Sequence, residues 1–417
     1  MVRDLSKKEK LLLQLMGRQP YLTREELSRI IGFKYAEYVS TLQKKLQKRE
    51  YFAGPLMFPD FGKIFKNNVT RIHAFIMFDT PYDYVKSLLQ EIDNWAFFYP
   101  LEEGIFRKYL VGFINSDAQK LRKIFEYLKD EQAIQYYHLF EQKCRWMVIS
   151  PTFLIEDQDA PVEPDFDHLL DETPVPDMEY GPFLDISLSK VAQMLIEHLW
   201  LGHGGCDLKK IVRSRKKIMA ERRSVLKEML RTEKEKETKK MIRAELKKLK
   251  GDVLLREFRE AYHFLVDHDV LEKLYYIWPF SHSKCTNFWL MIKCTSPEAT
   301  KHALFNFGKN VRIFTRVSMV QSVETREWYG AIYATCNPFL GGKLMTALDR
   351  HPEIEDRKLF PVRSYPLSHW DAQSISIEGY YNPETRTLDY PYNLFYERVK
   401  QKLEEDVNQR REARAFV

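Results

Sequence analysis

Three segments at the start of the chain carry apolar residues at helical spacing. They run over 5–16, 23–31 and about 35–49. Thr23 has Glu26 three residues on, a capping box that places a helix start at the second segment. The stretch that follows, 51–64, contains the Gly and Pro of a wing or turn. The pattern therefore predicts a three-helix head of the winged helix-turn-helix kind.

After this head the pattern switches between alternating and helical periods. Strands are expected at 70–79, 95–103, 105–114 and within 134–149, and helices at 82–92 and 116–130. Alternating apolar and β-branched residues are typical of half-buried strands. The order β-α-β-β-α-β is that of a ferredoxin-like split βαβ unit.

The second half repeats this order. A helix is expected at 188–201, followed by a basic helical region with a long helical insertion near 227–266. Strands then follow at 287–295, 311–322, 327–336 and 374–381, with helices at 296–309 and 341–351. The sequence predicts an α+β protein with an internal duplication, in which each of two fused units is a winged helix-turn-helix head followed by a ferredoxin-like body.

These patterns divide the chain into six parts. We expect a winged helix-turn-helix at 1–65, a ferredoxin-like domain at 66–155, an acidic linker at 156–183 and a second helical, winged-helix-like head at 184–284. A second ferredoxin-like domain at 285–395 and a charged C-terminal helix at 396–417 complete the chain.

The charge distribution changes this picture more than the net charge of +6 does. Residues 151–189 hold eleven acidic residues and no Lys or Arg, so the remainder of the chain carries +17. A basic body favours a polyanionic partner, although a basic soluble protein with an acidic linker is the alternative. Five scattered cysteines without a C-x-x-C spacing favour a reducing compartment. With no secretory leader and no apolar membrane span, we expect a cytoplasmic protein.

The third helix of the first head could contact double-stranded DNA. Val39, Leu42 and Leu46 share its apolar face. The early turns of a recognition helix meet base edges, whereas Lys and Arg further on meet phosphates. Lys near a helix C-terminus is also favoured by the helix dipole, so a solvated surface helix is the alternative. The candidate DNA contacts of this helix are Lys34, Tyr38, Ser40, Thr41, Lys44, Lys45, Lys48 and Arg49.

The second head is more basic. Leu208, Ile211 and Val212 can form a buried face, and the opposite side is densely cationic. A charge run is usually a solvated face, but this density favours contact with a polyanion. Its candidate DNA contacts are Arg213, Arg215, Lys216, Lys217, Arg222 and Arg223.

The segment "LTREELSRIIGFKYAEYVSTLQKKLQKREYFAGPLMFPDFGKI", joined to a β-α-β-β-α-β body, resembles the leucine-responsive and asparagine-responsive (Lrp/AsnC) transcriptional regulators. The resemblance implies a DNA-binding regulator and, because family members are usually dimers, a homodimer or a pseudo-dimeric monomer. It leaves a small effector open. The chain departs from the family pattern at Lys34, at Glu50-Tyr51 and at Lys108-Tyr109.

Other chemistry competes with this hypothesis. His198, His203 and Cys206 stand close together in the sequence, with Asp207 beside them, and His and thiolate are zinc ligands. No fourth ligand stands at a standard spacing and a helix end explains the segment more simply, so no metal or cofactor is expected. Some relatives of this architecture are tetrapyrrole-processing enzymes, for which the candidate pocket residues would be His73, His138, His302 and Arg326. We expect instead that the chain has no catalytic residues and is not an enzyme. A protein-interaction module that contacts the transcription machinery is the remaining alternative.

Overall fold

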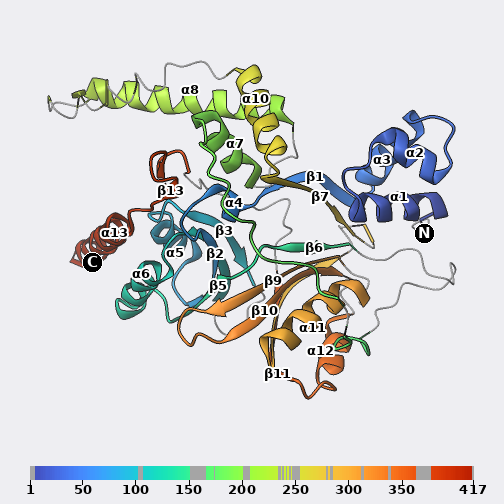
Figure 1. Ribbon diagram of the computed structural model, residues 1–417. Helices are drawn as coiled ribbons and strands as arrows, with labels where there is room; N and C mark the ends of the chain where they lie inside the picture. The colour runs from blue at the N-terminus through green and yellow to red at the C-terminus, as the bar shows by residue number, and fades with distance from the viewer. Residues whose placement is uncertain are drawn as a thin grey trace.

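The computed structural model describes residues 5–101, 107–150, 166–172, 174–200, 207–232, 254–278, 285–310, 314–336, 340–362 and 377–415, with residues 236, 239, 240, 242, 243, 246, 280 and 281 between them. Three short helices at its N-terminus form a compact head at one end of the molecule (Figure 1). Beneath the head and beside it lies a large antiparallel sheet with helices on its outer side.

The head consists of α1 (Lys7–Arg18), α2 (Arg24–Ile31) and α3 (Glu37–Lys48). The capping box predicted at the start of α2 is confirmed, because Thr23 N donates to Glu26 Oε2 at 2.7 Å and Glu26 N donates to Thr23 Oγ1 at 3.2 Å. Gly32, at φ 74°, ends α2 in the left-handed conformation that glycine adopts without strain. The head's own core contains Leu12, Leu13, Met16, Leu27, Ile31, Val39 and Leu46.

The segment expected to form a wing instead pairs with a distant part of the chain. Strand β1 (Phe52–Pro59) lies antiparallel to β7 (Leu271–Ile277), with Met57 opposite Lys273. The prediction of a local wing was wrong because strand pairing is decided by a partner far away in the sequence. The two-stranded sheet ties the first head to the second half of the chain.

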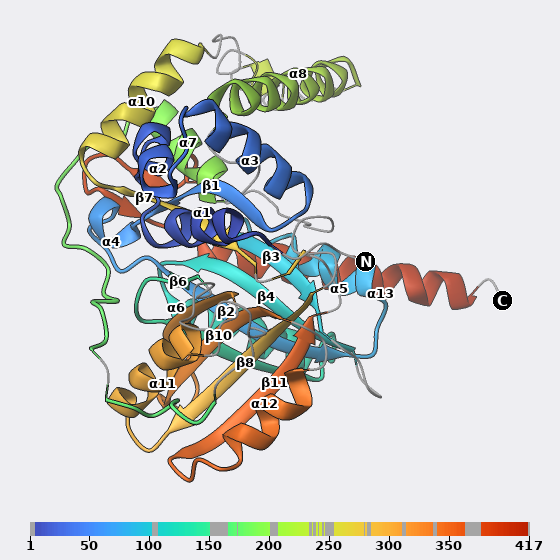
Figure 2. The same cartoon turned by 90° about the vertical axis from the view of Figure 1, so that its right-hand side faces the viewer.

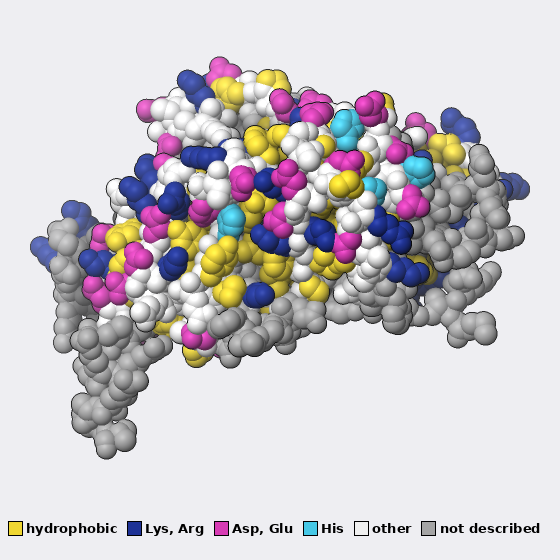
Figure 3. All heavy atoms as spheres, turned by 90° about the horizontal axis from the view of Figure 1, so that it is seen from below, with side chains coloured by type: hydrophobic (Ala, Val, Ile, Leu, Met, Phe, Trp, Pro, Cys, Tyr) yellow, Lys and Arg dark blue, Asp and Glu magenta, His cyan; other side chains and the backbone are white. Residues whose placement is uncertain are grey.

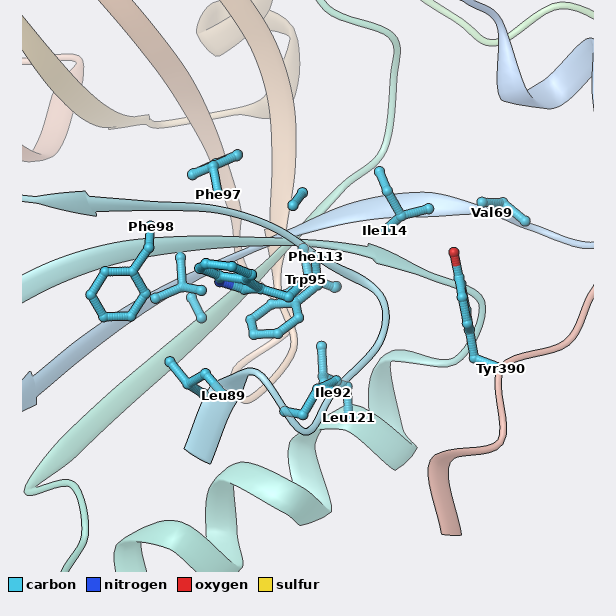
Figure 4. Packing of buried hydrophobic residues seen from close by; sticks show 14 of the residues in the cluster. Val69, Leu89, Ile92, Trp95, Phe97, Phe98, Phe113, Ile114, Leu121 and Tyr390 are labelled. Atoms are coloured by element: carbon cyan, nitrogen blue, oxygen red, sulfur yellow. The ribbon is translucent and has the colours of Figure 1, made fainter. Parts of the chain in front are cut away.

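The first ferredoxin-like body follows the predicted order. It comprises β2 (Thr70–Phe78), α5 (Tyr82–Leu89), β3 (Trp95–Pro100), β4 (Arg107–Asn115), α6 (Ala118–Asp130) and β5 (Tyr136–Gln142). The short α4 (Phe61–Ile64) precedes it and β6 (Met147–Ile149) follows it. Figure 4 shows how Trp95, Phe98 and Phe113 pack on the side of the sheet that faces these helices, whereas Phe97 lies on the opposite side of its strand.

The same element order occurs again as β8 (Thr286–Cys294), α11 (Pro297–Asn310), β9 (Phe314–Ser322), β10 (Trp328–Cys336), α12 (Leu340–Leu348) and β11 (Ile354–Val362). The last strand is not the expected 374–381, of which 374–376 lie outside the described residues. Strand β11 has the sequence "IEDRKLFPV", whose many polar residues hide the strand period because much of its surface is only half-buried.

The two bodies share one sheet of nine described strands in the order β11-β8-β10-β9-β5-β2-β4-β3, with β6 pairing beside β9. A bridge between Leu101, just after β3, and Val362, in β11, joins the two outermost strands. The sheet therefore curls into a closed barrel (Figure 2). Closure gives the barrel an interior that is separate from the outer, helix-covered side.

The second helical region sits above the barrel. It contains α7 (Lys190–Trp200), the 25-residue α8 (Leu208–Thr232), which extends beyond the rest of the molecule, and α10 (Leu255–Asp267) (Figure 1). Ile211 and Val212 are buried, as predicted. The small hairpin β12 (Tyr381–Asn382) and β13 (Thr387–Leu388) leads to the C-terminal α13 (Tyr392–Ala415). None of the helices within the described residues combines the length and the apolar character needed to cross a bilayer.

The described part of the acidic segment lies against both halves of the chain. Leu169 and Met178 are buried in the core beneath the second body. Gly181 N donates to Asp60 Oδ2 at 2.9 Å, and a Cβ at Gly62 would stand only 2.5 Å from the Cβ of Tyr180. The segment is therefore a strap that packs closely on α4.

Candidate functional site

Two rows of side chains face each other inside the barrel. The strand register places Phe97, Gly112, His73 and Phe140 side by side in the first body. In the second body, Arg316, Tyr333, Trp289 and Phe360 stand in the equivalent order. Side chains opposite each other on neighbouring strands lie on one face of a sheet, so each row points inward.

The two rows meet across the interior. The ring of His73 lies 4.8 Å from that of Trp289, although three strands separate their strands in the sheet. Trp146, which precedes β6, stands 5.6 Å from each of these two rings. The interior is thus lined by tilted and edge-on aromatic rings contributed by both halves of the chain.

Gly112 makes room for one of these rings. A Cβ on this residue would stand 2.1 Å from Cε1 of Phe97. Real side chains never approach so closely, and the obstructing ring is itself buried. The absence of a side chain at Gly112 therefore lets Phe97 lie flat over the sheet toward His73, at 5.9 Å between ring centroids.

Two arginines lie in this aromatic interior. Arg71 and Arg316 are only 5% and 8% exposed. Both guanidinium groups approach the Trp146 ring, at 5.9 and 5.5 Å, and Arg316 also lies 4.7 Å from the Tyr333 ring. Arg316 Nη1 donates to the Tyr276 hydroxyl at 3.1 Å. No carboxylate among the described residues forms an ion pair with Arg316.

The two arginines disfavour each other's charge. Burial, and then the positive charge of Arg316, lower the pKa of Arg71 to about 9. Burial also acts against the charge of Arg316, and its pKa is raised only by the neighbouring phenol groups of Tyr276, Tyr99 and Tyr333. At neutral pH the phenols of Tyr99 and Tyr333 are uncharged, since burial raises the pKa of Tyr99 to about 12 and that of Tyr333 well above its ordinary value. The positive charge of Arg316 therefore lies in the interior without a negatively charged side chain of the described set to balance it.

His73 is held in its neutral form. Burial, followed by the charges of Arg71 and Arg316, lowers its pKa well below the ordinary value. Within the described residues, neither ring nitrogen of His73 has a hydrogen-bond partner, and the same holds for Trp146 Nε1 and the Tyr333 hydroxyl. Buried polar atoms are nearly always paired in folded proteins. A bound molecule with hydrogen-bonding and anionic groups would satisfy this set.

Sequence reasoning named His73 but not the residues around it. A charged residue at a buried strand position needs a partner, which is a signal that can be read from the sequence. It could have found Arg71, in the pattern Arg-x-His of β2, and Arg316 in β9. The other candidates lie elsewhere. His138 stacks on Phe140 and shares a hydrogen bond with Ser322 Oγ at 2.9 Å. His302 is on α11 and Arg326 is in an exposed turn.

The DNA contacts predicted in the first head fall into two groups. Lys34, Tyr38, Thr41, Lys44 and Lys48 are exposed, and Ser40 is half-buried. Lys45 and Arg49 instead bind Glu9 of α1, with N–O distances of 2.9 and 3.1 Å to Glu9 Oε1. Because Glu9 is 2% exposed, these two cations serve first to neutralise a buried carboxylate.

The predicted contacts of the second head lie on α8 and its surroundings. Arg215 binds Glu197 at 3.4 Å and Glu378 at 3.2 Å, which fixes α8 to α7 and to the segment before β12. Arg213 Nε donates to Lys209 O, and Lys217 stands 3.8 Å from Glu221. Lys216 is exposed and Arg223 is half-buried. The side chain of Arg222 lies outside the described set, as do His203 and Cys206 of the metal alternative.

The chain matches no family model and no curated protein. Among solved structures, siroheme decarboxylase NirDL matches over 96% of this chain and 99% of its own, with 9% identity and a TM-score of 0.41. Its complex with an iron-uroporphyrin III analogue gives 9% identity, a TM-score of 0.40 and coverage of 96% and 100%. An AsnC-family transcriptional regulatory protein from Pyrococcus furiosus matches over 33% of this chain and 89% of its own, with 19% identity and a TM-score of 0.26.

The full-length matches are to an enzyme. They overturn the expectation that the chain is not one. The match to the AsnC-family protein covers only a third of the chain.

Proposed function

We propose that the chain is an enzyme that binds a carboxylated tetrapyrrole inside the barrel and removes a carboxylate from it. One observation carries the proposal. Arg316, without a carboxylate partner in the described set, and His73, without a hydrogen-bond partner there, share one interior lined by aromatic rings. A flat aromatic polyanion complements all three properties.

Charge supports an anionic ligand. A buried guanidinium costs several kcal/mol of unfolding free energy unless it is paired. Guanidinium groups bind carboxylates through two parallel hydrogen bonds. A carboxylate of a ligand would therefore be held at Arg316, near Arg71, where it would also offset the positive charge that, together with burial, lowers the pKa of Arg71.

Shape supports an aromatic ligand. Trp146, Trp289, Phe97 and Tyr333 present ring faces and edges to the interior, and rings stack favourably on other flat π-systems. Gly112 leaves the space in which the Phe97 ring lies. Because the rings of His73 and Trp289 are in contact, the ligand would lie beside this pair, with contacts from both halves of the chain.

The arginines would anchor carboxylates that do not react, since ion pairing stabilises a carboxylate against loss. The reacting carboxylate would lie near His73, in apolar surroundings that favour decarboxylation. The bond between the carboxylate carbon and its neighbour breaks, CO₂ leaves, and the electron pair stays on the neighbouring carbon, conjugated with the macrocycle. That carbon then takes a proton from His73, whose protonated form is favoured by the anionic ligand.

Binding of uroporphyrin III, followed by its absorption spectrum, tests the proposal. Arg316→Met should weaken binding at least about tenfold, because a charge-assisted hydrogen bond contributes about 1.5–3 kcal/mol. His73→Ala should bind but yield none of the decarboxylated product that mass spectrometry should detect with the unmodified protein. The matched control is Arg326→Met, in an exposed turn.

A flat cationic porphyrin of the same size is the control ligand, and it should not bind. Equal affinity for the anionic and cationic porphyrins, or unchanged affinity in the Arg316→Met variant, would overturn the proposal. Binding without release of CO₂ from uroporphyrin III or its iron complex would overturn the reaction step alone.

A second candidate function, binding of duplex DNA, is favoured by the exposed face of α3. Lys34, Lys44 and Lys48 are exposed there, together with Tyr38 and Thr41. On the face of the molecule that is seen from below in Figure 3, basic and acidic side chains are interspersed rather than separated by sign. Fluorescence anisotropy with a labelled duplex should therefore detect binding that weakens steeply with salt, and loss of binding in a Lys44→Ala, Lys48→Ala double variant.

A further inference from the structure

A cleft of about 500 Å³ separates the helices of the first head from the β1–β7 sheet. Its lining residues come from α1, α2 and α3 on one side and from β1 and β7 on the other. Its lining residues are Met16, Gln19, Pro20, Leu22, Thr23, Arg24, Leu27, Ser40, Gln43, Lys44, Gln47, Phe52, Gly54, Pro55, Lys273 and Tyr275.

The charged side chains that line this cleft all have the same sign. They are Arg24 of α2, Lys44 of α3 and Lys273 of β7, and neither Asp nor Glu occurs among the described lining residues. The Ser40 hydroxyl and the amides of Gln43 and Gln47 add hydrogen-bond donors. The lining therefore complements an anion with several acceptor oxygens.

Lys273 comes from the second half of the chain. Its backbone N–H donates to the Tyr21 hydroxyl at 3.0 Å, and its ammonium lies 5.9 Å from the rings of both Tyr21 and Tyr275. The pairing of β7 with β1 brings this cation to the first head, because Lys273 stands opposite Met57. The cleft is thus complete only when both halves are present.

We propose that this cleft holds a backbone phosphate of duplex DNA, with Lys273 as its contact from the second half of the chain. The proposal rests on the second candidate function. Lys44 connects the two surfaces, because it lines the cleft and also belongs to the exposed side of α3. A duplex lying along α3 would therefore place a phosphate at the cleft while Thr41 and Tyr38 face the groove.

The salt dependence of DNA binding tests this assignment. Each neutralised phosphate contributes about 0.9 to the slope of log Kd against log salt concentration. Anisotropy titrations of the full chain on a labelled duplex, at several KCl concentrations, should give a slope smaller by about 1 for Lys273→Ala than for the unmodified protein. Lys273→Arg keeps the cation and should retain the original slope.

Lys123→Ala removes an exposed lysine of α6 and is the matched control, which should leave the slope unchanged. Thermal unfolding of Lys273→Ala should coincide with that of Lys273→Arg, which separates loss of the phosphate contact from loss of the sheet. DNA binding with an unchanged slope in Lys273→Ala would overturn the assignment of the cleft alone. Absence of binding to any duplex would overturn both this assignment and the second candidate function.

Discussion

Replacing Arg316 by Met should stabilise the protein while it weakens binding of the ligand. In the free protein, Arg316 is a charged group that is 8% exposed and has no carboxylate partner in the described part of the chain. Burial opposes the charge of Arg316, and this charge, together with burial, lowers the pKa of the nearby Arg71. Met has a similar length and no charge, so it fills the same space without the desolvation cost.

The expected change in unfolding free energy is the difference between opposing contributions. The side chain would lose its contacts with the rings of Tyr333, Trp146 and Tyr276, at 4.7, 5.5 and 5.6 Å, together worth about 2 kcal/mol. The hydrogen bond to Tyr276 contributes about 1 kcal/mol. The desolvation of a buried cation costs several kcal/mol, and exchanges of buried ionic groups for apolar ones stabilise proteins by about 1–4 kcal/mol. We expect a net gain of about 1–3 kcal/mol.

Urea unfolding, followed by circular dichroism without ligand, measures this change. The midpoint should rise in Arg316→Met and the slope of the unfolding free energy should stay constant, which separates a change in stability from a change in the unfolded state. Arg326→Met should leave the midpoint within about 0.5 kcal/mol of the original. A decrease of more than about 1 kcal/mol in Arg316→Met would show that the arginine serves the fold, and would refute the reasoning that it is kept for a ligand.

Two further predictions concern neighbouring positions. Burial, and then the charge of Lys358, lower the pKa of His138 to about 4, so the unfolded state takes up a proton first as the pH falls below about 6.5. The unfolding free energy should thus fall by about 3 kcal/mol more between pH 6.5 and 4 in the unmodified protein than in His138→Gln, and equal pH profiles of the urea midpoint would contradict this sign. Gly112→Ala should lower the unfolding free energy by about 1–3 kcal/mol, because its Cβ would collide with Phe97. Gly342→Ala, in a helix where nothing lies within 4 Å, should raise the unfolding free energy by about 0.5–1 kcal/mol. Parallel thermal melts compare the two variants, and a stable Gly112→Ala variant would contradict the packing described for Phe97.

The sequence predicted local structure better than it predicted which distant segments pair with each other. The helices of the head and the repeated β-α-β-β-α-β order follow from periods and caps that a few neighbouring residues carry. The pairing of β1 with β7, the position of β11 and the bridge from Leu101 to Val362 depend on residues far apart in the chain, and no local pattern specifies them. For the same reason, the contacts within the candidate site could not be predicted from the sequence. His73 could be named as a candidate, but its contact with Trp289 exists only because the sheet closes.

The barrel is built by a single chain, so its two facing rows need not be equal. His73 occupies the strand position that Trp289 occupies in the other body, Gly112 corresponds to Tyr333, and Phe97 corresponds to Arg316. Two identical subunits would have to repeat each of these residues, and a flat ligand could then enter in two equivalent orientations. Here one wall carries the imidazole and the other carries the cation from β9. A ligand with several similar side chains would therefore be bound in one orientation, and the same side chain would be presented to His73 at every turnover.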